Sequence, residues 1–276
     1  MRRLYCSVTA LLIVYLALGS TPVAAGDASH TARTAAINGI ELYYEIHGSG
    51  EPLLLLHGGF GHTGSWHAQL PVLAAHFQVI AIDSRGHGRS SLGREPLSYA
   101  LMADDVLALL DTLGIERAHL LGWSDGGNIG LEIAIRAPQR LGHLVAFGAN
   151  YHPEGLRDDA ADNARFQAYI ARAREEYAER SPHPERWEEF AANISKMWAE
   201  QPNYSETELG AIRSPVLVLA GAEEEAIEIS HVEAMARLIA EATLSIMPGT
   251  GHFALWEQPE AFNRIVLEFL TGAPST

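Results

Sequence analysis

The most informative stretch of this chain is Leu121-Gly122-Trp123-Ser124-Asp125-Gly126-Gly127-Asn128. An apolar run precedes it and a helical pattern follows it, which predicts a sharp turn from a strand into a helix. Gly122, Ser124 and Gly126 match the pattern G-x-S-x-G. Such a turn strains the backbone of its middle residue, and side chains two positions to either side would collide. We therefore expect Ser124 to project from the turn at the amino-terminal end of a helix, where the helix dipole favours negative charge.

Short apolar runs recur on both sides of this turn. The run at 52–56 is apolar without alternation, which is typical of a strand buried on both faces of a parallel sheet. Further strands are expected at residues 39–46, 77–82, 119–123, 141–147, 216–220 and 243–247, and helices around residues 106–113, 129–135, 235–239 and 262–269. Strand and helix in repeated succession predict an α/β fold with a doubly wound, mostly parallel sheet.

One block between these elements contains no convincing strand. It extends over residues 151–209 and holds two helical stretches, at 163–179 and 185–199. We interpret the block as a helical cap inserted over one end of the sheet. The remaining segments, 26–150 and 210–276, would then form one core.

Residues 1–25 have the three zones of a secretory signal peptide. Arg2 and Arg3 form the positive end, residues 10–18 form the apolar run, and small residues lead up to Ala25. Cleavage after Ala25 is predicted, which would place the mature chain in the periplasm or outside the cell. An uncleaved membrane anchor is the alternative, although the apolar run is shorter than the roughly 20 residues that span a bilayer.

The composition excludes several classes of function. The chain has 276 residues and one cysteine, which allows no internal disulfide framework and no cysteine-based zinc cluster. Its 34 acidic and 19 basic side chains give a formal charge of −15, whereas a nucleic-acid surface needs clustered Lys and Arg. We therefore expect a small-molecule substrate, no nucleic-acid partner and, once the signal is cleaved, no stable membrane insertion. No pattern indicates an oligomeric state.

A serine nucleophile needs a base, and the base needs an acid that orients it. His252 lies in the Gly-rich stretch 247–253, after a predicted strand, from where its imidazole could reach Ser124. The acid is expected after another strand, between Ser124 and His252 along the chain. Three candidate carboxylates follow the next-to-last predicted strand: Glu223, Glu224 and Glu225.

Four segments together resemble the α/β-hydrolase superfamily of serine hydrolases, the esterases in particular. They follow the family's order along the chain: 57–60 (His-Gly-Gly-Phe), 83–90 (Asp-Ser-Arg-Gly-His-Gly-Arg-Ser), the Ser124 turn, and 249–253 (Gly-Thr-Gly-His-Phe). The resemblance implies an α/β-hydrolase fold, with Ser124 as nucleophile and His252 as general base, and neither metal nor cofactor. It also implies an oxyanion hole formed by the backbone N–H groups of Asp125 and Gly59, with Phe60 as the alternative second donor.

The acid departs from the family pattern. Relatives commonly read Gly-Asp-x-Asp after this strand, with the second Asp catalytic, whereas the corresponding stretch here is Gly221-Ala222-Glu223-Glu224. Glu224 therefore falls on the catalytic position, and Glu223 or Glu225 could take its place. Because glutamate is longer by one methylene group, its loop must retreat to keep the hydrogen bond to the imidazole.

The turn around Ser124 is also similar to that of valacyclovir hydrolase-like enzymes. In those enzymes the aspartate beside the nucleophile meets the ammonium group of an amino-acid ester, which implies a substrate-binding role for Asp125. The alternative is that the Asp125 carboxylate complements the amino-terminal end of the helix.

Aromatic residues supply further candidates for substrate contact: Phe60, Trp123 and Trp187. Trp187 shares the second helical stretch of the insertion with Phe190 and Trp198. For these three, packing against the core is the expected role and substrate contact the alternative. Other polar residues of the resembling turns are expected to be structural, because buried strands that end in loops need partners for their backbone groups: His57, Asp83, Arg85 and His87.

The leading prediction is an exported serine hydrolase that cleaves a carboxylic ester or a related acyl substrate through an acyl-enzyme. The same fold could instead carry amidase or aminopeptidase, perhydrolase or haloperoxidase, or carbon–carbon bond hydrolase activity. A non-catalytic binding protein is the third hypothesis, and a missing triad member would be its sign. All three members are present in this sequence, with the acid substituted.

Overall fold

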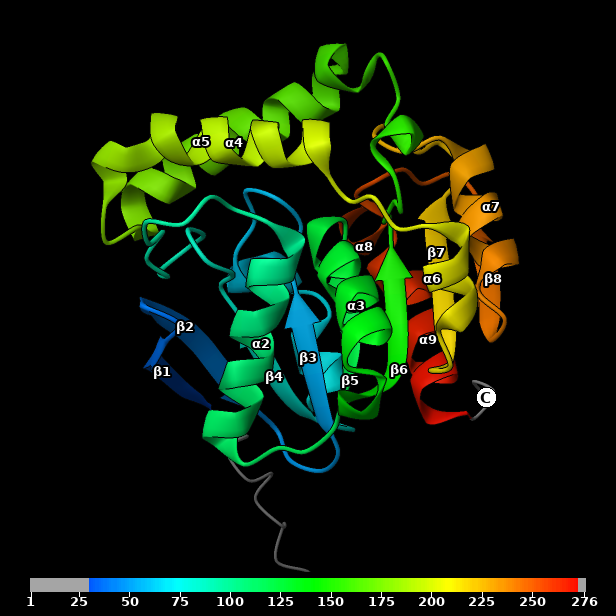
Figure 1. Ribbon diagram of the computed structural model, residues 1–276, viewed down its shortest axis with the longest axis horizontal. Helices are drawn as coiled ribbons and strands as arrows, with labels where there is room; N and C mark the ends of the chain where they lie inside the picture. Colours follow the sequence, from blue (N-terminus) through cyan, green and yellow to red (C-terminus); the bar gives the residue numbers. More distant parts are fainter. Residues whose placement is uncertain (1–29, 273–276) are drawn as a thin grey trace, which may run out of the picture.

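The computed structural model describes residues 30–272, which form one central sheet with helices on both faces (Figure 1). The strands are β1 (Thr31–Ile37), β2 (Ile40–His47), β3 (Pro52–Leu56), β4 (Gln78–Ile82), β5 (Ala118–Trp123), β6 (Leu141–Phe147), β7 (Val216–Gly221) and β8 (Ala242–Met247). Their order in the sheet is β1-β2-β4-β3-β5-β6-β7-β8. Among the strands between residues 30 and 272, only the pairs β1–β2 and β2–β4 are antiparallel, so the predicted mostly parallel sheet is confirmed. The predicted signal peptide, residues 1–25, lies outside the described residues.

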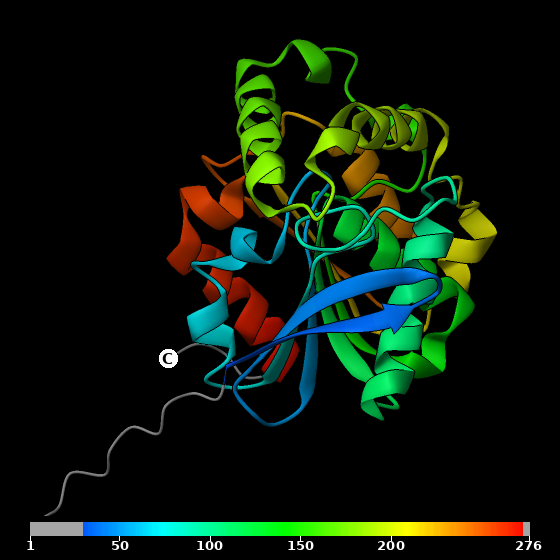
Figure 2. The ribbon, with the colours of Figure 1, turned by 90° about the vertical axis from the view of Figure 1, so that its left-hand side faces the viewer.

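The helices form two outer layers, which Figure 2 shows on either side of the sheet. One face is covered by α2 (Tyr99–Leu113), α3 (Asp125–Arg136) and α6 (Glu206–Ala211), and the other by α1 (Leu70–Leu73), α8 (Ala254–Glu257) and α9 (Pro259–Thr271). Helix α7 (Ile229–Leu238) packs on β7 and β8 next to α6. Short 3₁₀ turns lie at Thr63–Trp66, Pro138–Arg140, Pro153–Gly155, Ala160–Asp162 and Pro184–Arg186. The layers confirm the doubly wound arrangement.

The first strand, β1, is not predicted by the sequence patterns. Most of its side chains are exposed, because β1 forms the edge of the sheet and therefore lacks the apolar run of a buried strand. A two-residue turn, Asn38-Gly39, joins β1 to β2, with φ values of 44° and 78°. Asn-Gly is a strong hairpin signal because both of its residues tolerate positive φ, so this pair was the available clue.

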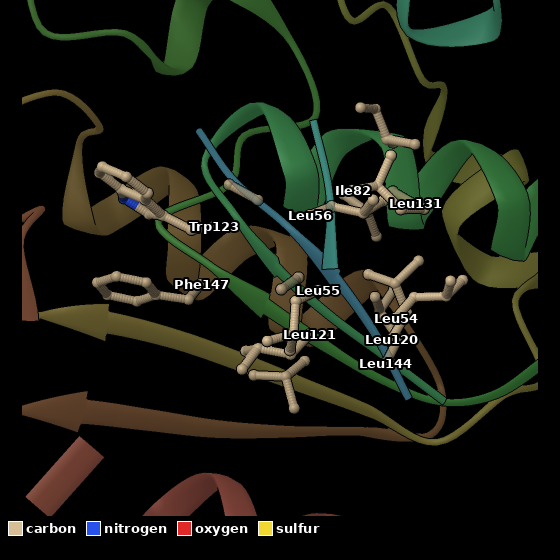
Figure 3. Packing of buried hydrophobic residues seen from close by; sticks show 14 of the residues in the cluster. Leu54, Leu55, Leu56, Ile82, Leu120, Leu121, Trp123, Leu131, Leu144 and Phe147 are labelled. Atoms are coloured by element: carbon tan, nitrogen blue, oxygen red, sulfur yellow. The ribbon is translucent and has the colours of Figure 1, made fainter. Parts of the chain in front are cut away.

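The core lies on both faces of the central strands. Leu54 of β3 pairs with Leu120 of β5, which in turn pairs with Leu144 of β6, and Figure 3 shows these three side chains together. Leu55 and Leu121, one position further along, point to the opposite face (Figure 3). Burial on both faces explains why these strands read as continuous apolar runs, and each buried leucine stabilises the fold by roughly 1.5–3 kcal/mol.

A helical cap lies over the carboxyl ends of the parallel strands. It is formed by α4 (Ala164–Arg180) and α5 (Trp187–Glu200), which stand above the sheet in both views (Figures 1 and 2). Tyr177 of α4 stacks on Phe190 of α5 with ring centroids 5.2 Å apart, and Phe190 also meets His87 of the core at 4.7 Å. The predicted cap insertion is thus confirmed. Between residues 30 and 272, no helix is long and apolar enough to cross a membrane.

Candidate active site

The turn at Ser124 has the strained backbone that the sequence predicts. Ser124 connects β5 to α3 with φ 53° and ψ −116°, a backbone conformation that residues other than glycine rarely adopt. A Cβ atom on Gly122 would lie 2.2 Å from the carbonyl oxygen of Gly126, and one on Gly126 would lie 1.9 Å from that of Leu56. Both glycines are therefore required for the turn to pack between its neighbours, and the serine is held at its tip.

His252 and Glu224 form a buried pair in the loops that follow two neighbouring strands. Glu224 follows β7 and His252 follows β8, so the parallel pairing of these strands brings their loops together. The Nδ1 atom of His252 lies 2.6 Å from Oε1 of Glu224, and both side chains are almost fully buried. The N–H of Ala226 also donates to Oε1 of Glu224 at 3.0 Å, which fixes the carboxylate from its own loop. A carboxylate placed in this way can orient a base.

The two neighbouring glutamates lie elsewhere. Glu223 is exposed to solvent. Glu225 is buried, but its Oε2 accepts the backbone N–H of His252 at 2.5 Å and its Oε1 accepts a hydrogen bond from Arg165 at 2.9 Å. Of the three candidate carboxylates, only that of Glu224 is hydrogen-bonded to the imidazole.

His252 lies beside the serine turn. The indole N–H of Trp123 donates to the carbonyl oxygen of His252 at 3.0 Å, which joins the residue before Ser124 to the histidine loop. Within residues 30–272, no hydrogen bond joins the hydroxyl of Ser124 to the imidazole. Hydrogen bonds between catalytic groups are often long without substrate and tighten in the complex.

The environment of His252 raises its pKa above the ordinary value. Burial favours the neutral imidazole and lowers the pKa, but the charge and the hydrogen bond of Glu224 raise it by more. The charges of Glu225 and Asp125 raise the pKa of His252 further. The protonated imidazole is therefore stabilised, which suits a group that must hold a proton during catalysis.

A cavity of about 350 Å³ lies between the cap and the serine turn. Ser124 and Asp125 line it from the core, and its apolar wall includes Leu156, Phe166, Ile170, Trp198 and Ile227. A largely apolar pocket with a few polar groups is the usual form of a small-molecule site. The predicted nucleophile thus lies at a cavity that has space for a substrate.

Asp125 presents a buried carboxylate at this cavity. Its Oδ1 accepts hydrogen bonds from the Tyr99 hydroxyl and from the Trp198 indole N–H, each at 2.9 Å. Its Oδ2 is buried and has no partner in the described part of the chain. Burial raises the pKa of Asp125 to about 6, although the hydrogen bonds from Tyr99 and Trp198 oppose the shift. One oxygen is therefore held by two hydrogen bonds, and the other has no partner among the described residues.

The loop after β3 supplies the remaining predicted residues. Gly59 lies against the cap, because a Cβ atom there would be 2.5 Å from the Trp198 ring, and its carbonyl oxygen accepts the Tyr169 hydroxyl at 2.7 Å. Phe60 has φ 64°. Among the described residues, no hydrogen bond engages the backbone N–H of Gly59, Phe60 or Asp125. These three N–H groups are the predicted oxyanion-hole donors, and each is free to donate a hydrogen bond to an oxyanion.

Three aromatic residues predicted to contact substrate do not line the cavity. Trp123 is 1% exposed and packs against Trp256 at 5.1 Å, with its N–H occupied by the histidine loop. Phe60 and Trp187 pack on each other at 5.3 Å between core and cap. These large rings fill the junction between core and cap, so the cavity does not support substrate contact by Trp123, Phe60 or Trp187; for Trp187, packing was the expected role.

Two cavity residues that hold Asp125 were not predicted as site residues. Tyr99 begins α2, and no local pattern marks it. Trp198 lies on the helical stretch for which packing was expected, and its ring both packs on Phe60 at 5.4 Å and lines the cavity. Both donate to Asp125, which lies more than 20 residues away along the chain, so only the folded structure shows the connection.

The polar turn residues have the structural contacts that were expected. The N–H of Ser84 donates to Nε2 of His57 at 3.0 Å, which leaves Nδ1 to donate to the carbonyl oxygen of Gly58 at 2.8 Å. Burial lowers the pKa of His57 to about 4, consistent with a neutral ring. Arg85 forms two hydrogen bonds with the buried carboxylate of Asp105, at 2.7 and 2.8 Å.

Comparisons with known proteins agree with this geometry. The alpha/beta hydrolase family matches residues 53–265. A protein from Caulobacter sp. (strain K31), whose name assigns it provisionally as the carbamate hydrolase RutD, is 34% identical over 260 residues, covering 84% of this chain and 96% of its own. A 2-hydroxy-6-oxo-6-phenylhexa-2,4-dienoate hydrolase from Comamonas testosteroni is 29% identical over 83% of this chain and 91% of its own. The enol-lactonase from Burkholderia xenovorans LB400 has a similar structure, with a TM-score of 0.70 and 27% identity over 87% of this chain and all of that one. This chain belongs to the alpha/beta hydrolase family.

Proposed function

We propose that this protein is a serine hydrolase that cleaves a carboxylic ester or a related acyl substrate through an acyl-enzyme. One observation carries the proposal: the strained Ser124 turn opens into the cavity beside a buried histidine whose Nδ1 lies 2.6 Å from the carboxylate of Glu224. A nucleophile, a base and an orienting acid in this order along the chain are what acyl transfer requires.

In the first half-reaction, the hydroxyl oxygen of Ser124 attacks the substrate carbonyl carbon. His252 accepts the hydroxyl proton on Nε2, and Glu224 holds the proton on Nδ1 and stabilises the resulting imidazolium. The carbonyl oxygen becomes an oxyanion, which accepts hydrogen bonds from the N–H of Asp125 and that of Gly59 or Phe60. His252 then gives its proton to the leaving group as the acyl-enzyme forms.

The second half-reaction repeats these steps with water. His252 removes a proton from a water molecule, and the hydroxide attacks the acyl carbon of the ester on Ser124. The same backbone N–H groups stabilise the second oxyanion, and removal of one such donor typically costs about 2.7–4 kcal/mol of transition-state stabilisation. The acid product leaves and Ser124 regains its proton from His252.

A fluorophosphonate probe tests this proposal directly. We expect covalent labelling of the wild type and complete loss of labelling in Ser124→Ala. Ser195→Ala is a matched control, because Ser195 lines the same cavity from the cap and should not affect labelling. Failure of the folded wild type to react would contradict the proposal.

The relatives' names suggest which substrates to compare. They include a carbamate hydrolase and a hydrolase of a dienoate, and the latter name favours the carbon–carbon bond alternative. A panel of an ester, a lactone, an amide, a carbamate and a vinylogous diketone would measure kcat/KM for each class. We expect the ester or lactone to be the best substrate, and a clear preference for another class would replace the ester assignment.

We further propose that Asp125 binds an ammonium or other cationic group of the substrate. Its unpartnered Oδ2 and its place on the cavity support this role over that of a simple partner for the helix terminus. Asp125→Asn keeps an acceptor for Tyr99 and Trp198 but removes the charge. It should lower kcat/KM for an α-amino ester and leave that for the desamino ester nearly unchanged; equal losses would contradict the role.

Export is also proposed, on the zones of residues 1–25 alone. Amino-terminal sequencing of the protein from a periplasmic or culture-supernatant fraction should begin at Gly26. An intact chain in the membrane fraction would instead show that the segment is retained as an anchor.

A further inference from the structure

We propose that His30, Glu45 and His47 form a binding site for a divalent transition-metal ion, with Zn²⁺ as the expected occupant. The three side chains lie at the β1–β2 edge of the sheet, and one ligand atom from each lies within 4.8 Å of the others. The family resemblance implies no metal, so this proposal departs from that expectation; the site is separate from the cavity at Ser124.

Backbone pairing brings these three residues to one face. Glu45 and His47 are two positions apart on β2, so their side chains point to the same side of the strand. Thr31 pairs with Ile46 at the start of β1, and continuing this antiparallel register places His30 opposite His47. The two imidazole rings lie 4.4 Å apart, as expected for a cross-strand pair.

The distances match those between ligands of a tetrahedral zinc ion. Oε2 of Glu45 lies 3.0 Å from Nε2 of His47 and 3.6 Å from Nε2 of His30. Bonds of 2.0–2.1 Å in a tetrahedron place neighbouring ligand atoms about 3.3 Å apart. An ion could therefore sit between the three atoms with only small side-chain movements, each imidazole binding through Nε2 while Nδ1 keeps its proton.

Neighbouring groups hold the carboxylate in place. The other oxygen of Glu45, Oε1, accepts hydrogen bonds from the Tyr43 hydroxyl at 2.8 Å and from the Thr63 hydroxyl at 3.4 Å. Arg89 approaches the same oxygen at 3.9 Å. Such outer contacts orient the ligands of metal sites. The side chains of Glu45 and His47 are 16% and 15% exposed, whereas that of His30 is 53% exposed, which leaves a path for the ion.

The ligand set selects the class of ion and suggests its effect. Two imidazoles and one carboxylate favour Zn²⁺, Cu²⁺ or Ni²⁺ over Mg²⁺ and Ca²⁺, which prefer oxygen ligands alone. A bound ion would join the start of β1 to β2 and, through Glu45 and Thr63, to the loop that follows the predicted oxyanion residues. We expect it to stabilise the sheet edge and not to enter the hydrolytic reaction.

Calorimetric titration tests the site with the mature chain, free of any affinity tag and stripped of metal with a chelator. Zn²⁺ should bind at one ion per chain and raise the thermal midpoint. His30→Gln and His47→Gln should each weaken this binding at least tenfold, and Co²⁺ should give visible absorption bands in the wild type that both variants lose. His30→Gln changes an exposed side chain and therefore should not disturb folding.

Two control variants separate this site from other histidines. His76 is exposed and lies outside the cluster, and His143 of β6 stacks on His119 of β5, at the centre of the sheet. His76→Gln and His143→Gln should bind Zn²⁺ as the wild type does. The proposal is overturned if the wild type binds no Zn²⁺. It is also overturned if both His30→Gln and His47→Gln bind Zn²⁺ as the wild type does, or if His143→Gln loses the binding instead.

Discussion

Position 224 carries glutamate where relatives of this family commonly carry aspartate, and the structure shows how the longer side chain is held. Oε1 of Glu224 meets the imidazole of His252 at 2.6 Å while accepting the N–H of Ala226 from its own loop. Gly148 leaves room for the pair, because a Cβ atom there would lie 3.0 Å from the His252 ring. Residue identity at these positions therefore sets the geometry of the proposed base.

Neutralising each glutamate in turn tests which one is the acid. Glu224→Gln should lower kcat by roughly 10³–10⁴-fold, because the amide can no longer stabilise the imidazolium. Glu223→Gln is the matched control and should retain wild-type turnover, since Glu223 is exposed. Steady-state kinetics on a reactive ester measures both. Comparable activity in all single variants, including Glu225→Gln, would contradict the assignment.

The pH dependence of kcat/KM reports the base. Because the net effect of its surroundings raises the pKa of His252 above 6.5, activity should fall on the acid side at a pH above that value. In Glu224→Gln, burial would dominate and lower the pKa of His252. The acid limb of the profile should then move to lower pH; an unchanged limb would show that another group controls it.

Asp125→Asn should change the pH dependence of stability. The folded-state pKa of about 6 lies above the ordinary 3.8, so folding favours protonated Asp125. Its contribution to stability is present below about pH 4 and is lost as the pH rises through 6. Relative to the wild type, the variant should therefore gain up to about 3 kcal/mol in free energy of unfolding between pH 4 and 7.5. Urea denaturation at both pH values measures the gain, and Asp158→Asn, at an exposed position on the same cavity, should show none.

At the scale of elements, Arg165 adds ion pairs to the contacts between the cap and the histidine loop. Arg165 of α4 forms ion pairs with both Glu225 and Glu257. Each of these carboxylates also accepts a backbone N–H of the loop, from His252 at 2.5 Å and from Gly251 at 2.7 Å. The position of the imidazole therefore depends on where α4 lies.

Arg165→Gln tests this connection. It should lower kcat, roughly tenfold if the imidazole shifts by about 1 Å, with little loss of stability because Arg165 is largely exposed. Loss of the arginine also leaves two carboxylates uncompensated, which should raise the pKa of His252 and move the acid limb to higher pH. Arg174→Gln, on the same helix but paired with Glu188, is the control and should change neither quantity.

At the scale of the whole molecule, the free energy of unfolding at acid pH depends on histidine side chains that are neutral in the folded state. Burial is the largest cause that lowers the pKa of His57 and of His231 to about 4, and it places that of His87 well below its ordinary value. Because the pKa of these histidines is lower in the folded state, the unfolded chain binds protons at these side chains at a higher pH than the folded chain does. Their contribution to stability is present above pH 6.5 and is lost as the pH falls toward 4.

The free energy of unfolding should consequently be lower at pH 5 than at pH 7.5, by about 2 kcal/mol for His57 alone. Asp125 and His252 act in the opposite direction, because their folded-state pKa values are raised. The decrease should therefore be steeper in Asp125→Asn than in the wild type. Equal or greater stability at pH 5 would show that the buried imidazoles do not control acid unfolding.

Local patterns in the sequence determined the strand and helix succession, the strained turn at Ser124 and the chain order of the proposed nucleophile, acid and base. These features depend on neighbouring residues or on the order of elements along the chain, so they can be predicted without a structure. The tertiary structure decided the features that depend on distant contacts. It separated Glu224 from Glu223 and Glu225, placed Trp198 on the cavity but not Trp187, and gave Asp125 its partners. The physical reason is that a side chain's solvent exposure and hydrogen bonds are set by residues that meet it only after the chain has folded.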